Sequence, residues 1–188
     1  MKRPAIFLDR DGTLIEDCEY LADPARVRVL DGVAQGLRHL RAAGFACVIV
    51  TNQSGIGRGM LTEADYQRVH DAMIAHLGAE GADIDAAYFC PVAPRSADPL
   101  ADEHPDRKPN PGMLLRAAAE LDLDLSRSWM IGDAVRDLVA GVRAGCRGGI
   151  LVTTGKPVAP GALLAAGVVG GFTTATFDEA VNIILRSN

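Results

Sequence analysis

The sequence lacks the features that would place the chain in a membrane, on nucleic acid or outside the cell. None of its apolar runs approaches the roughly 20 residues that a membrane-spanning helix needs. Basic residues (19) are outnumbered by acidic ones (24), and the resulting net charge of −5 disfavours nucleic-acid binding, which calls for a basic face. The apolar run behind the basic residues 1–3 stops at Asp9, too early for a signal peptide. We therefore expect neither a nucleic-acid nor a membrane partner.

Cysteines are few and scattered. Cys18, Cys47, Cys90 and Cys146 show no paired spacing of the kind that disulfide frameworks have. No internal repeat, low-complexity tract or interdomain linker interrupts the 188 residues, of which 48% are hydrophobic. A chain of this length and composition can bury a sizeable core. We expect a single domain over residues 1–188 that works in a reducing cytoplasm.

Strand-like and helix-like segments alternate along the chain. Short apolar runs bounded by turn residues predict five strands, over residues 6–8, 46–50, 86–90, 129–131 and 148–152. Helical periodicity predicts helices over residues 32–43, from 62 to beyond 77, 111–121, 135–144 and 177–185. Such alternation predicts an α/β fold with a Rossmann-like, doubly wound parallel sheet covered on both faces.

Three helix starts carry capping signals. Asp31 is expected to cap the first helix, and Thr62 with Asp65 forms a capping-box-like pair for the second. Asn110-Pro111 is typical of an N-cap followed by the first helical residue. The segments between these elements are short, so we expect no large cap domain over the sheet; only residues 17–30 and 91–106 can overhang its edge.

Polar clusters follow four of the predicted strands. They are Asp9/Asp11 within Asp-Arg-Asp-Gly-Thr, Thr51 to Ser54, Arg107-Lys108, and Asp133/Asp137. Ligands of doubly wound sheets bind at the carboxyl ends of the strands, so we expect the clusters to converge there. Two acids at the end of a buried strand call for a cation between them. The pattern predicts a Mg²⁺-dependent phosphoryl-transfer site.

These residue types suit that chemistry. Asp9 is ionised at neutral pH and can attack phosphorus directly, while Asp11 can protonate the leaving alkoxide and then deprotonate water. Hard oxygen ligands for Mg²⁺ are expected from Asp9, the Asp11 carbonyl and Asp133. Lys108 and Thr51 are expected to hold the equatorial phosphate oxygens, with Asp137 as a supporting residue that positions Lys108 or a metal-bound water.

Each of these residues also has a simpler interpretation. Thr51 alone is as well explained as a strand-end hydroxyl, Lys108 as a solvated charge and Asp133 as a helix N-cap. Residues 54–59 look like a nucleotide-binding loop, but Met60 stands where the dinucleotide fingerprint needs glycine and the P-loop lysine is absent. We interpret them as a flexible loop in which backbone amides and Arg58 meet phosphate or sugar oxygens.

The four motifs in this order resemble the haloacid dehalogenase (HAD) superfamily over nearly the whole chain. Residues 51–59 and 107–113 are similar to its histidinol-phosphatase-related branch. The resemblance implies a HAD-like fold, a monomer, and a phosphomonoesterase that forms an aspartyl-phosphate. It further implies removal of the 7-phosphate of D-glycero-D-manno-heptose 1,7-bisphosphate, a step of lipopolysaccharide-core synthesis.

The same resemblance implies which residues bind substrate. They are Asp17, Tyr20, Asn52, Gln53, Ser54 and Arg107, to which the loop interpretation adds Arg58. A guanidinium such as that of Arg107 can hold the second phosphate of a bisphosphate by two hydrogen bonds. The alternative substrates are histidinol phosphate or another small phosphate ester.

The chain departs from this branch at its zinc loop. Many members bind a structural zinc through Cys-x-His and Cys-x-Cys, whereas this sequence has Cys90-Pro-Val and His104-Pro-Asp106. Cys90, His104 and Asp106 leave three candidate ligands where a structural zinc site has four. We therefore favour a loop without zinc.

Two other classes of protein remain as alternatives. A receiver-type phospho-switch also gathers Asp, Thr and Lys around Mg²⁺, but Asp11 would supply an acid/base that a stable switch does not want. A non-catalytic phosphate-binding module is the second alternative, and the four intact motifs argue against it. Multiple turnover would favour the phosphatase, and a persistent phosphoprotein the receiver.

Overall fold

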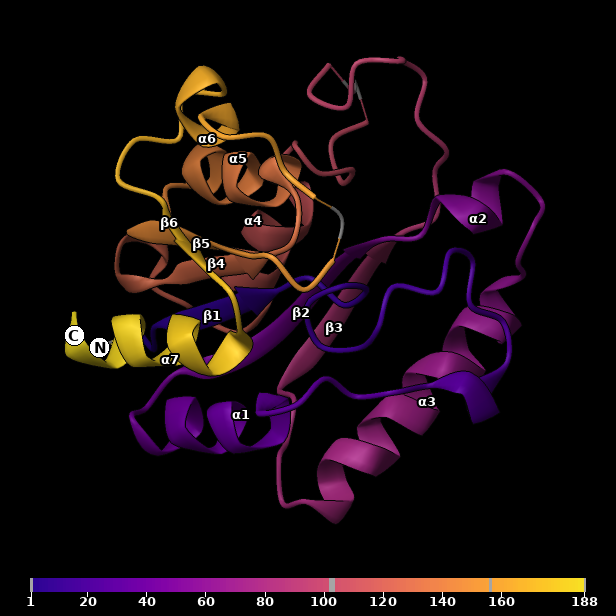
Figure 1. The fold of residues 1–188 in the computed structure, drawn as a ribbon, viewed down its shortest axis with the longest axis horizontal. Helices are drawn as coiled ribbons and strands as arrows, with labels where there is room; N and C mark the ends of the chain where they lie inside the picture. Colours follow the sequence, from indigo (N-terminus) through magenta and orange to yellow (C-terminus); the bar gives the residue numbers. More distant parts are fainter. Residues whose placement is uncertain (1, 102–103, 156, 188) are drawn as a thin grey trace.

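The computed structural model describes residues 2–101, 104–155 and 157–187, and its centre is a six-stranded parallel sheet (Figure 1). The strand order is β3-β2-β1-β4-β5-β6. The strands are β1 (Ala5–Leu8), β2 (Ala46–Asn52), β3 (Ala86–Cys90), β4 (Trp129–Gly132), β5 (Gly148–Val152) and β6 (Phe172–Thr174). The chain winds outward from β1 to β3 and then returns to the other side of β1. This reversal confirms the doubly wound α/β fold and creates a switch point between β1 and β4.

Helices cover both faces of the sheet. On one face lie α1 (Val33–Ala42), α3 (Glu63–Ala79) and α7 (Phe177–Arg186); on the other lie α4 (Gly112–Glu120) and α5 (Val135–Ala144) (Figure 1). Shorter turns of helix are α2 (Ser54–Gly57), α6 (Ala162–Ala165), η1 (Pro24–Arg26) and η2 (Leu125–Arg127). None of the described helices has the length and apolar character needed to cross a membrane.

The central strand is buried on both sides. Ile6 and Leu8 belong to the core beneath α1 and α7, whereas Ala5 and Phe7 belong to the core beneath α4 and α5. Successive strand residues point to opposite faces, so a continuous apolar run is what a strand between two helical layers requires. The same run delivers the next residue, Asp9, to the edge of the sheet with 4% of its surface exposed.

Some local predictions were wrong. Asp31 does not cap α1; Gly32 occupies the N-cap with a φ of +80°, and no side chain caps the helix there. Pro111, not Asn110, is the N-cap residue of α4, and the Asn110 side-chain oxygen instead accepts from Arg143 Nη1 at 2.9 Å. The start of the predicted loop after Gln53 is the helical turn α2, and β6 and α6 were not predicted.

The capping box of α3 is present as predicted and gives a testable stability difference. The Thr62 hydroxyl accepts from the Asp65 amide at 3.0 Å, and the Asp65 carboxylate accepts from the Thr62 amide at 2.8 Å. Thr62→Ala should lower the free energy of unfolding by about 1 kcal/mol in urea titrations. Asp31→Ala is the matched control and should change it by less than about 0.5 kcal/mol. Equal losses in the two variants would contradict this assignment of the caps.

Candidate active site

The predicted site residues meet at the carboxyl ends of β1, β2 and β4. Asp9 directly follows β1, Thr51 lies at the end of β2, and Asp133 directly follows β4. A cavity of about 580 Å³ opens there. Its polar lining includes Asp9, Asp11, Asp17, Tyr20, Thr51, Asn52, Gln53, Ser54 and Asp133. The structure therefore brings most of the predicted site residues to one cavity.

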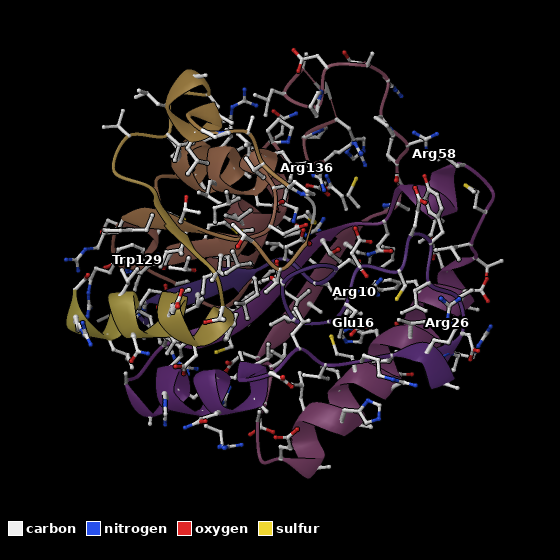
Figure 2. The ribbon with its side chains drawn as sticks, viewed as in Figure 1. Arg10, Glu16, Arg26, Arg58, Trp129 and Arg136 are labelled. Carbon is white, nitrogen blue, oxygen red and sulfur yellow. The ribbon has the colours of Figure 1, made fainter. Side chains whose placement is uncertain are left out.

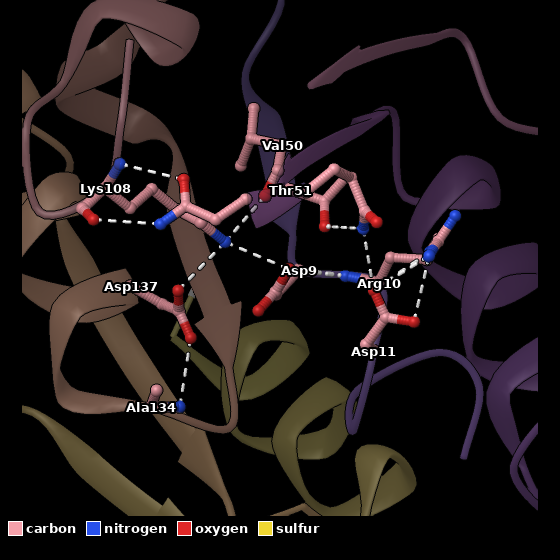
Figure 3. A network of polar contacts seen from close by, with 10 residues as sticks. Asp9, Arg10, Asp11, Val50, Thr51, Lys108, Ala134 and Asp137 are labelled. Atoms are coloured by element: carbon pink, nitrogen blue, oxygen red, sulfur yellow. Dashed lines mark hydrogen bonds and ion pairs between the residues drawn. The ribbon is translucent and has the colours of Figure 1, made fainter. Parts of the chain in front are cut away.

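Lys108 is fully buried and is not among the lining residues; it belongs to the polar network of Figure 3. Its Nζ lies 3.0 Å from Asp9 Oδ1 and 2.9 Å from Asp137 Oδ1, and it donates to the Val50 carbonyl at 2.7 Å. The ammonium group is thus engaged by one hydrogen bond and two close ion pairs. Burial lowers the pKa of Lys108, but the charges of Asp137 and Asp9 outweigh it and hold that pKa above its ordinary value. Lys108 is therefore a fixed cation that orients two carboxylates.

Asn52 holds the backbone that carries this lysine. Its Oδ1 accepts from the Lys108 amide at 3.0 Å, and its Nδ2 donates to the Lys108 carbonyl at 2.9 Å. Asp137 is fixed in a similar way, because its Oδ2 accepts from the Ala134 amide at 3.0 Å at the start of α5. The pair of bonds from Asn52 ties the end of β2 to the segment after β3.

Asp9 is held through one of its two carboxylate oxygens. Oδ1 faces Lys108 and also accepts from the Arg10 amide at 2.7 Å. Burial raises the pKa of Asp9, but the charges of Lys108 and Arg136 outweigh this effect and hold that pKa below its ordinary value. Asp9 therefore stays ionised although it is buried, and its second oxygen, Oδ2, carries no hydrogen bond from the described residues.

Asp11 lies on the other side of Asp9 and is tethered by two residues. Arg10 donates to both of its oxygens, from Nε at 3.1 Å and from Nη2 at 3.0 Å. Gln53 Nε2 donates to Asp11 Oδ2 at 2.8 Å and to Thr51 Oγ1 at 3.0 Å. The Arg10 guanidinium is itself fixed over the Tyr66 ring, 5.1 Å from its centroid. Arg10 thus orients Asp11, a role that the sequence analysis missed.

Three buried carboxylates form a candidate metal centre. Asp9, Asp133 and Asp137 each offer an oxygen within 4.8 Å of the others, and no other group of three such ligands occurs among the residues that the structure describes. Burial and the charges of Asp9 and Asp137 raise the pKa of Asp133 from 3.8 to about 7. Carboxylate oxygens are the donors that Mg²⁺ prefers. The residues present therefore fit a divalent cation bound by hard oxygen ligands.

Glycines let the backbone approach this centre closely. Gly12 has a φ of +78°, and a Cβ there would lie 2.6 Å from Asp133 Oδ2. A Cβ on Gly155 would also clash with the Asp133 carboxylate. The glycine of the Asp-x-Asp-Gly-Thr motif is therefore required by both the turn and the packing against Asp133.

Two predicted substrate contacts lie outside the cavity lining. The Arg107 side chain is largely buried, and its Nη1 donates to the Val92 carbonyl at 2.8 Å. Arg58 is exposed at the outer side of α2, whereas Arg136 lies further inward (Figure 2). Arg136 lines the cavity but was not predicted as a site residue. The only signal for it in the sequence is its place between Asp133 and Asp137.

Two of the three candidate zinc ligands contact each other, and the third is paired with an arginine. Cys90 Sγ lies 3.7 Å from His104 Nδ1, and the Asp106 carboxylate pairs with Arg116 at 2.8 Å. The segment that leads to Lys108 is therefore held in part by an ion pair and by the hydrogen bonds of Asn52.

The comparisons with known proteins agree with this geometry. The family model described as HAD-hydrolase-like matches residues 106–168. A D-glycero-β-D-manno-heptose-1,7-bisphosphate 7-phosphatase of Yersinia pestis is 45% identical over 156 residues, 82% of this chain and 83% of that protein. The enzyme of the same name from Escherichia coli K12 is 43% identical over 164 residues, 87% of this chain and 86% of its own. The chain belongs to the HAD-like phosphatases.

A solved structure of the same family aligns over almost the whole of this HAD-like chain. It is the D,D-heptose 1,7-bisphosphate phosphatase of B. bronchiseptica complexed with magnesium and phosphate. It is 32% identical, has a TM-score of 0.82, and the alignment covers 98% of this chain and 99% of that one. Its fold confirms the HAD-like α/β architecture of this phosphatase. As a member of this family, the chain is a phosphoric monoester hydrolase.

Proposed function

We propose that the chain is a Mg²⁺-dependent phosphatase that removes the 7-phosphate of D-glycero-D-manno-heptose 1,7-bisphosphate. The observation that carries the reaction class is the arrangement at Asp9. This ionised carboxylate lies at the end of β1, is held on one oxygen by Lys108 and lines the cavity beside Asp11. The substrate is supported by the names of relatives that share 43–45% identity with this chain.

The first half of the reaction is phosphoryl transfer to Asp9. Its Oδ2 attacks phosphorus as the bond to the ester oxygen breaks, because Oδ1 is occupied by Lys108 and the Arg10 amide. Asp11, in its protonated form, gives its proton to the departing alkoxide. Thr51 is placed to help, since its oxygen accepts from Gln53 and its own hydroxyl proton can be donated to a phosphate oxygen.

The second half is hydrolysis of the aspartyl-phosphate. Asp11 takes a proton from a water molecule that attacks phosphorus, which releases inorganic phosphate and restores the Asp9 carboxylate. Arg10 and Gln53 hold Asp11 beside the cavity for both proton transfers. One residue thus acts first as general acid and then as general base.

Asp9, Asp133 and the Asp11 carbonyl would hold the cation, with Asp137 close by. Bound Mg²⁺ supplies positive charge that offsets the repulsion between the carboxylates and the phosphate. Lys108 offsets part of the same repulsion, because it pairs with Asp9 and Asp137. We also propose that the enzyme works as a monomer in the cytoplasm, without nucleic-acid or membrane partners.

The proposal is tested by phosphate release from two esters side by side. With Mg²⁺ present, we expect preferential turnover of the heptose 1,7-bisphosphate over histidinol phosphate. Turnover of histidinol phosphate alone would keep the reaction and overturn the substrate. A phosphoprotein that persists without turnover would instead indicate a phospho-switch.

Binding of Mg²⁺ should also stabilise the fold. In Mg²⁺-free protein the folded state keeps a proton on Asp133 up to a pH of about 7, whereas the unfolded carboxyl loses it near pH 4. The contribution of Asp133 to stability therefore falls as the pH rises through this window. We expect Mg²⁺ to raise the melting temperature at pH 8, since a bound cation stabilises the folded state.

The matched variant is Asp133→Asn, which removes the charge and keeps the shape. Its Mg²⁺-free melting temperature should fall less than that of the wild type between pH 5 and pH 8, and its response to Mg²⁺ should be much smaller. Differential scanning fluorimetry in both conditions measures the two effects. An undiminished Mg²⁺ response in this variant would contradict the assignment of the metal centre.

A further inference from the structure

The two basic residues at 107 and 108, which we predicted from the sequence to bind substrate phosphate, do not line the cavity. Lys108 is not among the lining residues; its Nζ pairs with Asp9 and Asp137 and donates to the Val50 carbonyl. Arg107 lies outside the cavity lining, and one of its terminal nitrogens is bonded to the Val92 carbonyl. The Lys108 ammonium is therefore already engaged by two carboxylates and a carbonyl before any phosphate binds.

Two arginines do line the cavity. Arg10 uses Nε and Nη2 on the Asp11 carboxylate, and its side chain is almost fully buried. Arg136 lies on the first turn of α5, and its buried Nε has no hydrogen-bond partner. Within the described part of the chain, Arg136 is thus the cavity-lining arginine whose guanidinium is not committed to one carboxylate.

The charge of Arg136 acts on the centre of the site. It lowers the pKa of Asp9 and opposes the rise in the pKa of Asp133, so its guanidinium is close enough to affect both carboxylates. The charge of Asp17, which lines the same cavity, favours the charged form of Arg136. Arg136 and Asp9 line the same cavity, and the reacting phosphate must enter this cavity to reach Asp9.

We propose that Arg136 binds the phosphate that is transferred to Asp9, through hydrogen bonds from its guanidinium to the phosphate oxygens. This inference rests on the proposed phosphatase function and makes Arg136 a further catalytic residue of that site. A guanidinium suits the position because its planar fork matches phosphate oxygens and its charge is permanent. A positive group that faces the phosphate also stabilises the charge that shifts to its oxygens during transfer.

The alternative is that Arg136 only offsets the charge of the neighbouring carboxylates. In that case its removal would alter stability while leaving the affinity for phosphate nearly unchanged. Direct binding of inorganic phosphate therefore separates the two roles, since it measures contact with the anion without depending on turnover.

The experiment compares Arg136→Met, Arg136→Lys and the control Arg68→Met by calorimetric titration with inorganic phosphate in the presence of Mg²⁺. Arg68 is exposed on α3, where it pairs with Asp65, so its replacement removes the same charge at a residue that does not line the cavity. Arg136→Met should weaken phosphate binding by about 10- to 100-fold. Arg136→Lys should recover part of this loss, because it keeps the charge and loses the fork; it also serves if Arg136→Met does not fold.

Kinetics with two esters locate the phosphate that is bound. Arg136→Met should lower kcat/KM by a similar factor for the heptose 1,7-bisphosphate and for a simple monophosphate ester, because both present the reacting phosphate. A loss confined to the bisphosphate would overturn the inference, as would unchanged phosphate affinity or an equal loss in Arg68→Met. Failure of the proposed function is recognised separately, by absence of wild-type turnover.

Discussion

Replacing Asp9 by asparagine is expected to lower kcat for phosphate release by about 10⁴-fold or more, the scale seen when a nucleophile is removed. An amide has no negative charge with which to attack phosphorus, and no other described residue is held by both Lys108 and the Arg10 amide as Asp9 is. The measurement is steady-state release of inorganic phosphate from the bisphosphate at saturating Mg²⁺. The variant should remain folded, since asparagine keeps the shape and both oxygen contacts need only Oδ1.

The control for this variant is Asp122→Asn. Asp122 is an exposed aspartate paired with Lys2 at the surface, so the same chemical change there should leave kcat within about twofold. Turnover of Asp9→Asn at a rate near that of the control would remove Asp9 from the role of nucleophile. The HAD-like fold would stand, but the reaction would need another acceptor for the phosphoryl group.

The second large effect is expected on stability, from Lys108→Met. This variant leaves Asp9 and Asp137 buried without the cation that lies 3.0 and 2.9 Å from their oxygens. Removing one partner of a buried ion pair typically costs about 3–5 kcal/mol of unfolding free energy. Urea unfolding of the Mg²⁺-free proteins measures the loss, because bound Mg²⁺ would offset part of it.

A second substitution tests the cause of that loss. Lys108→Met combined with Asp137→Asn removes one of the two uncompensated charges, and asparagine can still accept from the Ala134 amide. The double variant should therefore be more stable than Lys108→Met by more than about 1 kcal/mol, whereas Asp137→Asn alone should destabilise the protein. Additive losses would show that Lys108 and Asp137 do not act as a pair.

The sequence was sufficient to predict the elements that depend on local pattern. The apolar run of β1 and the acids that end it follow from a strand buried on both faces, and the capping box of Thr62 needs only residues three apart. By contrast, β6 is a three-residue edge strand with two exposed residues, so it has too little apolar pattern to be recognised. Asp31 failed as a cap because Gly32 makes the turn into α1 with a left-handed conformation that no side-chain pattern reports.

The candidate site was predictable in its residue types but not in its contacts. Motif order brings Asp9, Asp133 and Lys108 together because parallel strands end at one edge of the sheet. Which cation faces the cavity depends on side-chain direction, and a buried Lys108 cannot be told from an exposed one by spacing. Whether Arg136 faces the cavity depends on how α5 is turned relative to the edge of the sheet, and the role of Arg10 depends on its contact with Asp11. A single sequence reveals neither.

The most direct test of the central claim is to look for phosphate on Asp9 during turnover. The wild-type enzyme is mixed with excess heptose 1,7-bisphosphate and Mg²⁺, quenched in acid within milliseconds, and digested for mass spectrometry. We predict one added phosphoryl group on the peptide that contains Asp9, present during turnover, absent after the substrate is exhausted and absent in Asp9→Asn. Rapid turnover with no phosphoryl group on Asp9 at any time would contradict the account.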